Sequence, residues 1–129
     1  MGEESKFAVP DSRTAIEEAK KQGLVPVFPG PNQLQIDIDS DAQFAVYKRN
    51  KDIVHQYWGI VHEMIELSKS GGERRHITLT LKGTVGVLER IGLQAVLGSD
   101  LKREQFSLVR VLQKDAHPTL FFEKEKREE

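Results

Sequence analysis

The stretch LQIDID at residues 34–39 decides the fold, because apolar and polar side chains alternate along it without a break. In a β-strand such alternation buries the apolar residues on one face and leaves the polar residues on the other. Asp37 and Asp39 would then lie side by side, and two carboxylates repel each other unless a cation neutralises them. Oxygen ligands of this kind suit Mg²⁺ or Mn²⁺, so the pair predicts a metal site. The alternative is a solvated strand end, since acidic residues also favour the start of a following helix.

A second alternating stretch, HITLTL at residues 76–81, predicts another strand whose three apolar side chains are buried. The Ser-Gly-Gly run at 70–72 predicts the end of the preceding helix and a turn into this strand. We expect the strands at 33–38, 76–81 and 119–123 to form one sheet with helices packed on one face. The Asp pair and His76 would then lie on the open face.

Helical patterns fill the intervals between these strands. Asp11 or Ser12 predicts the cap of a first helix that runs to Lys21. The segment VPVFPGPN at residues 25–32 carries three prolines, which excludes a central strand there. Three further helices are expected: from a Ser40 cap to about residue 68, as one long helix or two consecutive ones; from a Thr84 cap to about residue 97; and over 101–112, where a strand is the alternative.

Length and composition limit the classes of protein that fit. The chain has 129 residues, which predicts a single domain over 1–129, with a core at about 24–124 and a charged tail at 125–129. Its net charge of -1 argues against bulk electrostatic coating of nucleic acid, so any such contact would be local. It has no cysteine, which excludes a disulfide framework and a Cys-based zinc site. No apolar stretch is long enough to span a bilayer and no signal-peptide pattern is present, so we expect a cytoplasmic protein without a membrane partner.

The order of these motifs resembles the archaeo-eukaryotic primase superfamily, which includes primase-polymerases of phages and plasmids. The shared pattern is a strand with alternating apolar and Asp residues, a Gly-rich turn, a His that opens the next strand, and a later Asp. The resemblance implies a minimal α+β fold with a small RRM-like or primase-like sheet. It also implies that Asp37, Asp39 and Asp100 hold the catalytic Mg²⁺ or Mn²⁺, and that His76 contacts a nucleotide phosphate. The closing segment, residues 109–124, resembles the nucleotide-binding stretch of that family, which would assign nucleotide binding to Arg110 and Lys124.

Basic residues near these motifs add a predicted phosphate-binding patch. Arg74 and Arg75 directly precede His76, and the wider basic group comprises Arg74, Arg75, Lys102, Arg103 and Arg110. Two functions follow. The first is metal-dependent nucleotidyl transfer in phage or plasmid DNA replication. The second is a non-catalytic module that binds nucleotides, single-stranded nucleic acid or a protein partner.

Overall fold

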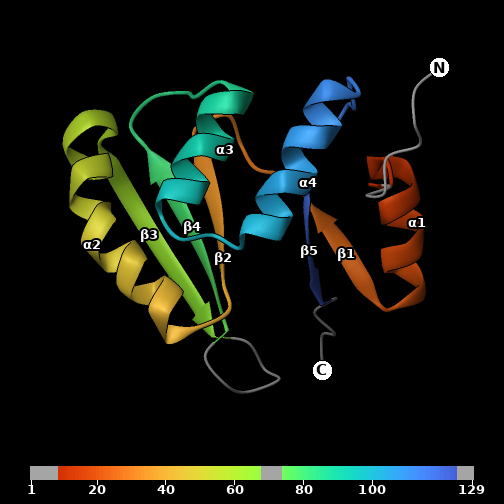
Figure 1. The fold of residues 1–129 in the computed structure, drawn as a ribbon, viewed down its shortest axis with the longest axis horizontal. Coiled ribbons are helices and arrows are strands. Elements are labelled where there is room, and N and C mark those ends of the chain that lie inside the picture. The colour runs from red at the N-terminus through yellow and green to blue at the C-terminus, as the bar shows by residue number, and fades with distance from the viewer. Residues whose placement is uncertain (1–8, 68–73, 125–129) are drawn as a thin grey trace.

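The two alternating stretches pair with each other as antiparallel strands. β2 (Gln33–Ile38) lies against β4 (Arg75–Leu81), with Asp37 opposite His76. The structure, a computed structural model, describes residues 9–67 and 74–124 and has an α+β fold (Figure 1). The apolar side chains of both strands are at most 1% exposed, which confirms their predicted orientation toward a core.

A third strand replaces the last part of the predicted long helix. α2 (Asp41–Trp58) ends at Gly59, which has a positive φ of 69°, and β3 (Ile60–Leu67) then pairs antiparallel with β4. The prediction of a helix to about residue 68 is therefore wrong. The apolar residues of β3 recur at spacings of three and four, as on a helix, because β3 is an edge strand exposed on both faces and needs no strict alternation.

The strand predicted at 119–123 lies in a different sheet from β2 and β4. β5 (Phe121–Lys124) pairs antiparallel with β1 (Leu24–Val27), whereas the other strands form a separate sheet in the order β2-β4-β3. The prediction of one sheet is wrong, because residues of the helical segment that follows β4 already occupy the outer edge of β2. Pro26 is tolerated in β1, since each strand of a two-stranded sheet has a free edge.

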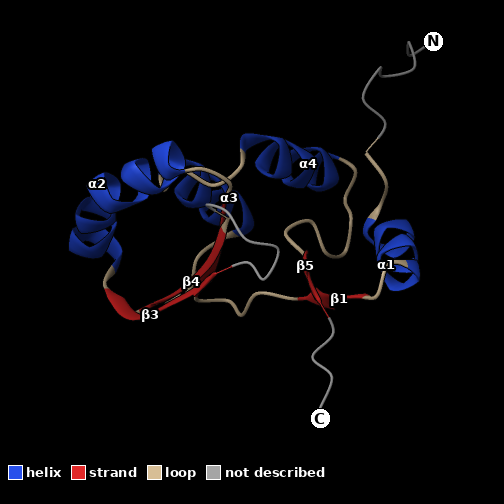
Figure 2. Ribbon diagram, turned by 90° about the horizontal axis from the view of Figure 1, so that it is seen from below, coloured by secondary structure: helices blue, strands red, loops and turns tan. Residues whose placement is uncertain are grey.

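Helices cover one face of the three-stranded sheet, as predicted. α2 and α3 (Val87–Val96) lie on that face (Figure 2), and α3 begins after Gly86 rather than at the predicted Thr84 cap. The Glu89 side chain accepts a hydrogen bond from the Gly86 N–H at 3.2 Å, which fixes this start. The buried core between helices and sheet comprises Leu34, Ile36, Ile38, Tyr47, Val54, Ile77, Leu79, Leu81, Leu93 and Leu97.

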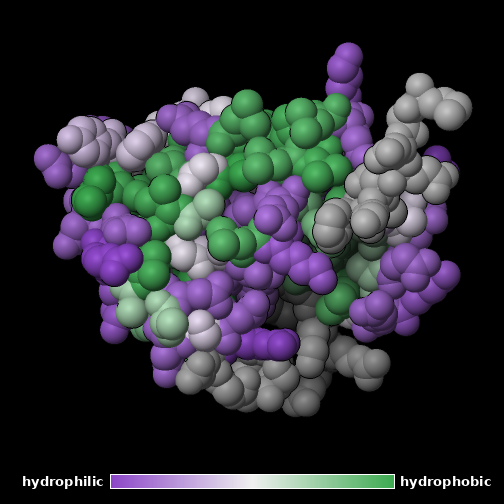
Figure 3. Space-filling model, in the orientation of Figure 1, coloured by the Kyte–Doolittle hydropathy of each residue, from purple (hydrophilic) through white to green (hydrophobic). Residues whose placement is uncertain are grey.

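The remaining helices lie toward the smaller sheet (Figure 1). α1 (Ser12–Lys21) is capped by Asp11, and α4 (Leu101–Leu112) confirms the helix preferred over a strand in that segment. The face drawn in Figure 3 carries apolar side chains over α3 and α4. Leu101 and Leu108 of α4 are among the exposed apolar residues.

The predicted turn at 70–72 and the predicted charged tail at 125–129 lie outside the described residues. Within 9–67 and 74–124, no helix has the length and apolar character needed to cross a membrane.

Candidate metal centre

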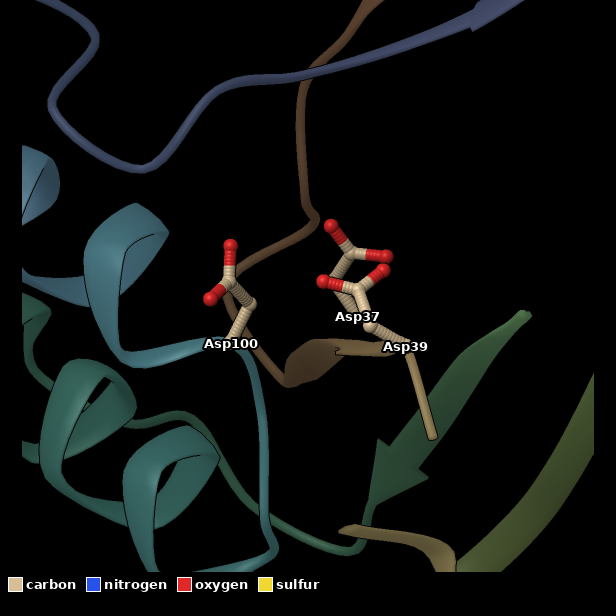
Figure 4. A group of neighbouring side chains, drawn as sticks. All are labelled: Asp37, Asp39 and Asp100. Carbon is tan, nitrogen blue, oxygen red and sulfur yellow. The ribbon is translucent and has the colours of Figure 1, made fainter. Parts of the chain in front are cut away.

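Three carboxylates from two distant parts of the chain meet beside the end of β2. Asp37 belongs to β2, Asp39 directly follows it, and Asp100 precedes the first residue of α4 (Figure 4). One carboxylate oxygen of each lies within 4.8 Å of the others. The structure thus brings the later Asp of the predicted metal set to the Asp pair, although Asp100 lies 61 positions after Asp39 in the sequence.

Backbone hydrogen bonds place Asp100 beside Asp37. The Asp100 N–H donates to the carbonyl oxygen of Asp37 at 2.8 Å, and the Asp37 N–H donates to Ser99 Oγ at 3.1 Å. Both backbone groups of Asp37 point away from β4, so the turn before α4 takes the place of a neighbouring strand. Gly98 has a φ of 85°, and a Cβ at this position would lie only 2.7 Å from the Gln43 carbonyl oxygen. The turn therefore requires glycine.

The next outward residue of β2 is held in the same way. The Gln35 N–H donates to Gln94 Oε1 at 2.9 Å, and the Gln35 carbonyl oxygen accepts from Arg103 Nη1 at 2.6 Å. Gln94 Nε2 and Arg103 Nη1 both donate to the Glu104 carboxylate, at 2.9 Å and 3.3 Å. This closed network joins β2, α3 and α4, and it fixes Arg103 next to the acidic cluster.

A cavity of about 300 Å³ opens beside the carboxylates. Its polar side is formed by Asp37, Asp100, His76 and two cations of α4, and its apolar side comes from α4, β5 and the residue that precedes β5. Phe121 lies between His76 and Arg103, with its ring centroid 5.3 Å from that of His76 and 5.0 Å from Arg103 Cζ. The lining residues are Asp37, His76, Asp100, Lys102, Arg103, Phe106, Leu120, Phe121 and Phe122.

The electrostatics of the cluster favour a bound cation. Burial raises the pKa of the Asp37 carboxyl, and the charges of Asp39 and Asp100 raise it further. The His76 imidazole and the Arg103 guanidinium act in the opposite direction but do not outweigh burial. His76 Nδ1 lies 3.9 Å from Asp37 Oδ1, too far for a hydrogen bond, and it is buried without a partner among the described residues. Three close carboxylates and few compensating hydrogen bonds are the donor set that Mg²⁺ or Mn²⁺ prefers.

The two arginines that precede His76 lie in different surroundings. Arg74 Nε lies 4.0 Å from Asp39 Oδ1, at the edge of the acidic cluster. Arg75 faces α2, where its Cζ lies 4.2 Å from the Phe44 ring centroid and its Nη1 lies 3.4 Å from Asp41 Oδ1. Alternation along β4 thus directs Arg75 to the helix-covered face, away from His76.

Arg110, one of the two residues implied by the family's nucleotide-binding stretch, does not line the cavity. Arg110 is buried and donates from Nε to the Pro10 carbonyl oxygen at 3.2 Å. Burial lowers its pKa. The described part of Lys124 is its backbone, which pairs with Leu24 in the smaller sheet.

The cations that reach the cavity are Lys102 and Arg103, which belong to the wider basic group of the sequence. Both residues follow Asp100 in the first turn of α4. Their closeness in sequence to a predicted metal ligand is the signal that could have assigned them to the site. The aromatic residues Phe106, Phe121 and Phe122 could not be assigned to the site in advance, because nothing local indicates that β5 faces α4.

A scan against models of protein families, a search of curated proteins and a search of solved structures each returned no match to this chain.

Proposed function

We propose that this chain is a primase-like protein that binds a nucleotide through a divalent metal ion and uses it in nucleotidyl transfer, in the cytoplasm, during phage or plasmid DNA replication. The observation that carries the proposal is the position of Asp100. Its carboxylate lies within 4.8 Å of those of Asp37 and Asp39, at the edge of a cavity that also contains cations. If the three aspartates only stabilised the starts of helices, their carboxylates would not need to lie close to one another.

The donor set fits the proposed ion. Asp37, Asp39 and Asp100 would hold Mg²⁺ or Mn²⁺, which when bound would neutralise phosphate charge and act as a Lewis acid. The raised pKa of Asp37 is consistent with this role, because a buried carboxylate among like charges gains most from a cation.

The remaining residues of the cavity match the other parts of a nucleotide. Lys102 and Arg103 supply positive charge for phosphate oxygens that the metal does not reach. His76 lines the cavity, and its imidazole can donate a hydrogen bond to a phosphate oxygen. Phe106 and Phe122 provide an apolar surface on which a base can stack.

Calorimetric titration with Mn²⁺, followed by titration with a nucleoside triphosphate, tests the binding steps. We expect the Asp37→Asn/Asp39→Asn double variant to lose the Mn²⁺ heat, and Lys102→Ala to keep it but to weaken nucleotide binding about tenfold. Asp52→Asn and Lys20→Ala change exposed residues outside the cavity and serve as matched controls. Equal Mn²⁺ heats in the double variant and the unmodified chain would reject the metal centre.

A primer-synthesis assay with Mn²⁺ and labelled nucleotides tests the chemical step. Synthesis that the Asp39→Asn substitution abolishes would support the transferase. Metal-dependent nucleotide binding without synthesis would instead support the non-catalytic module.

A further inference from the structure

We infer that the free edge of β3 is a dimer interface, at which β3 of a second copy of this chain pairs antiparallel and extends the sheet. The two edges of the three-stranded sheet differ. Residues of α3 and α4 satisfy the outward backbone groups of β2, whereas no strand of the described residues pairs with the outer edge of β3. An uncovered edge is a template for another strand.

The hydrogen-bond pattern identifies the backbone groups at this edge. Because Gln35 and Asp37 direct their backbone groups away from β4, the alternate residues of β2 bond to β4. In β4, Thr78 and Thr80 therefore direct their backbone groups toward β3. The residues opposite them, Met64 and His62, form the hydrogen bonds between β3 and β4. The N–H and C=O groups that point outward from β3 therefore belong to Glu63, Ile65 and Leu67.

β3 carries two carboxylates, of which Glu63 is paired with Lys51 Nζ at 2.7 Å, but it lacks the other usual protection of an edge strand. From residue 62 to residue 67 there is no proline and no lysine, and the one irregularity in the pairing with β4 lies before His62. Apolar side chains are exposed instead, with Met64 at 44%, Ile65 at 41% and Leu67 at 70%. Burial of these side chains is the driving force for association.

The sequence of β3 is complementary to itself in only one of its central registers. Two residues that are opposite each other in an antiparallel pair direct their backbone groups the same way, both toward the partner strand or both away from it. Paired residue numbers in the dimer therefore have an even sum, and the two-fold axis passes through a residue and not between two residues. An axis at Glu63 places this carboxylate opposite its own copy, and an axis at Ile65 places Glu66 opposite Met64. An axis at Met64 places His62 of each copy opposite Glu66 of the other, and Glu63 opposite Ile65.

The pairing of an imidazole with a carboxylate at both ends therefore selects the register centred on Met64 and the second copy as the occupant. His62 and Glu66 lie on the open face of the sheet, and Glu66 is opposite His76 of the same chain. Asp37, His76 and Glu66 are opposite one another on three neighbouring strands and form a row of polar side chains across the open face of the sheet. The dimer would extend this row into the second copy. His62 of the second copy would be its next member.

Sedimentation velocity of the full chain from micromolar to millimolar concentration tests the dimer. We expect a concentration-dependent dimer that His62→Glu weakens about tenfold or more, because this change places two carboxylates opposite each other at both ends of the interface. Glu66→Lys should weaken it similarly by placing Lys opposite His62. Leu112→Glu changes an exposed apolar residue of α4 and should leave the association unchanged.

A mixture of two variants tests the register. In a heterodimer of His62→Glu with Glu66→Lys, the new Glu lies opposite the new Lys, and the original His62 and Glu66 still face each other. The mixture should therefore dimerise more tightly than either variant alone. A monomer at all concentrations would overturn the dimer. Dimerisation unaffected by both single changes, or no gain on mixing, would overturn this register.

Discussion

Replacement of Asp100 by Asn should increase the stability of the metal-free chain and weaken its binding of Mn²⁺. Asn is as good a helix cap as Asp, so the hydrogen bond from the Lys102 N–H, at 3.4 Å, can be kept. The substitution removes mainly the charge of one carboxylate. Opposite effects on metal-free stability and on metal affinity are expected only if the three carboxylates share one ion.

The size of both effects can be worked from the separation of the carboxylates. Two unit charges 4.8 Å apart repel by about 1 kcal/mol in bulk water, and Asp100 has two such neighbours. The loss of its favourable interaction with the helix dipole costs about 0.3–1 kcal/mol. The metal-free Asn variant should therefore be more stable by about 1 kcal/mol at low salt. Removal of one charge from a dication at about 4 Å costs about 2 kcal/mol in water, which is about a 30-fold loss of affinity.

Urea unfolding with a chelator, and again with saturating Mn²⁺, measures both quantities. A metal that binds only the folded chain raises its free energy of unfolding, so the gain should be large for the unmodified chain and smaller for Asp100→Asn. Asp52→Asn, an exposed residue of α2, should behave as the unmodified chain in both conditions. A variant that is destabilised in chelator, yet gains as much from Mn²⁺ as the unmodified chain, would refute the shared site.

Two further outcomes follow from the same region. Burial raises the folded-state pKa of Asp37 above its ordinary value of 3.8, so the folded chain retains a proton that the unfolded chain has lost, and metal-free stability should fall as pH rises through the raised pKa. Asp37→Asn should reduce that slope in urea unfolding from acidic to neutral pH, and an unchanged slope would contradict the assignment. Gly98→Ala should destabilise the chain by about 1–3 kcal/mol and weaken Mn²⁺ binding, because the left-handed φ and the Gln43 carbonyl both oppose a Cβ. Gly83→Ala meets no atom within 4 Å, so thermal unfolding and Mn²⁺ titration of the two variants should separate them.

The parts of the fold that the sequence predicts are those with strict local periodicity. The alternation in β2 and β4 identifies both strands and the face that Ile77 and Leu79 bury. β3 is missed because its exposed positions relax the alternation, and because Gly59 lies inside an otherwise helical pattern. Gly59, directly after Trp58, is the signal in the sequence that could have ended the helix, and it adopts a φ of 69° there.

Long-range pairing is the part that local patterns do not determine. β5 has a recognisable strand sequence, but nothing in it indicates that β1, rather than β2, is its partner. That choice depends on Gln94, Ser99, Asp100 and Arg103, whose side-chain and backbone groups satisfy the edge of β2. Polar residues that replace a strand have no periodic signature in the sequence.

In the candidate site, too, local periodicity predicts some positions and long-range contacts determine the others. Periodicity places Asp37 and His76 on one face, and β2 and β4 confirm this placement. The approach of Asp100 was expected from the family resemblance alone. Arg75, although next to His76 in sequence, lies on the other face because neighbours in a strand point in opposite directions.

The hydrogen bonds at the outer edge of β2 also make the positions of the three carboxylates independent of the far wall of the cavity. The spacing of the carboxylates is set within β2 and the turn that precedes α4, whereas the far wall of the cavity belongs to β5, which pairs with β1 instead. Substitution of Phe122 can therefore change the size of an accepted ligand without moving any of the three carboxylates. Substitution of Ser99, which holds the Asp37 backbone, can change metal affinity while leaving that wall in place. For the proposed function, metal binding and ligand size could thus be varied one at a time.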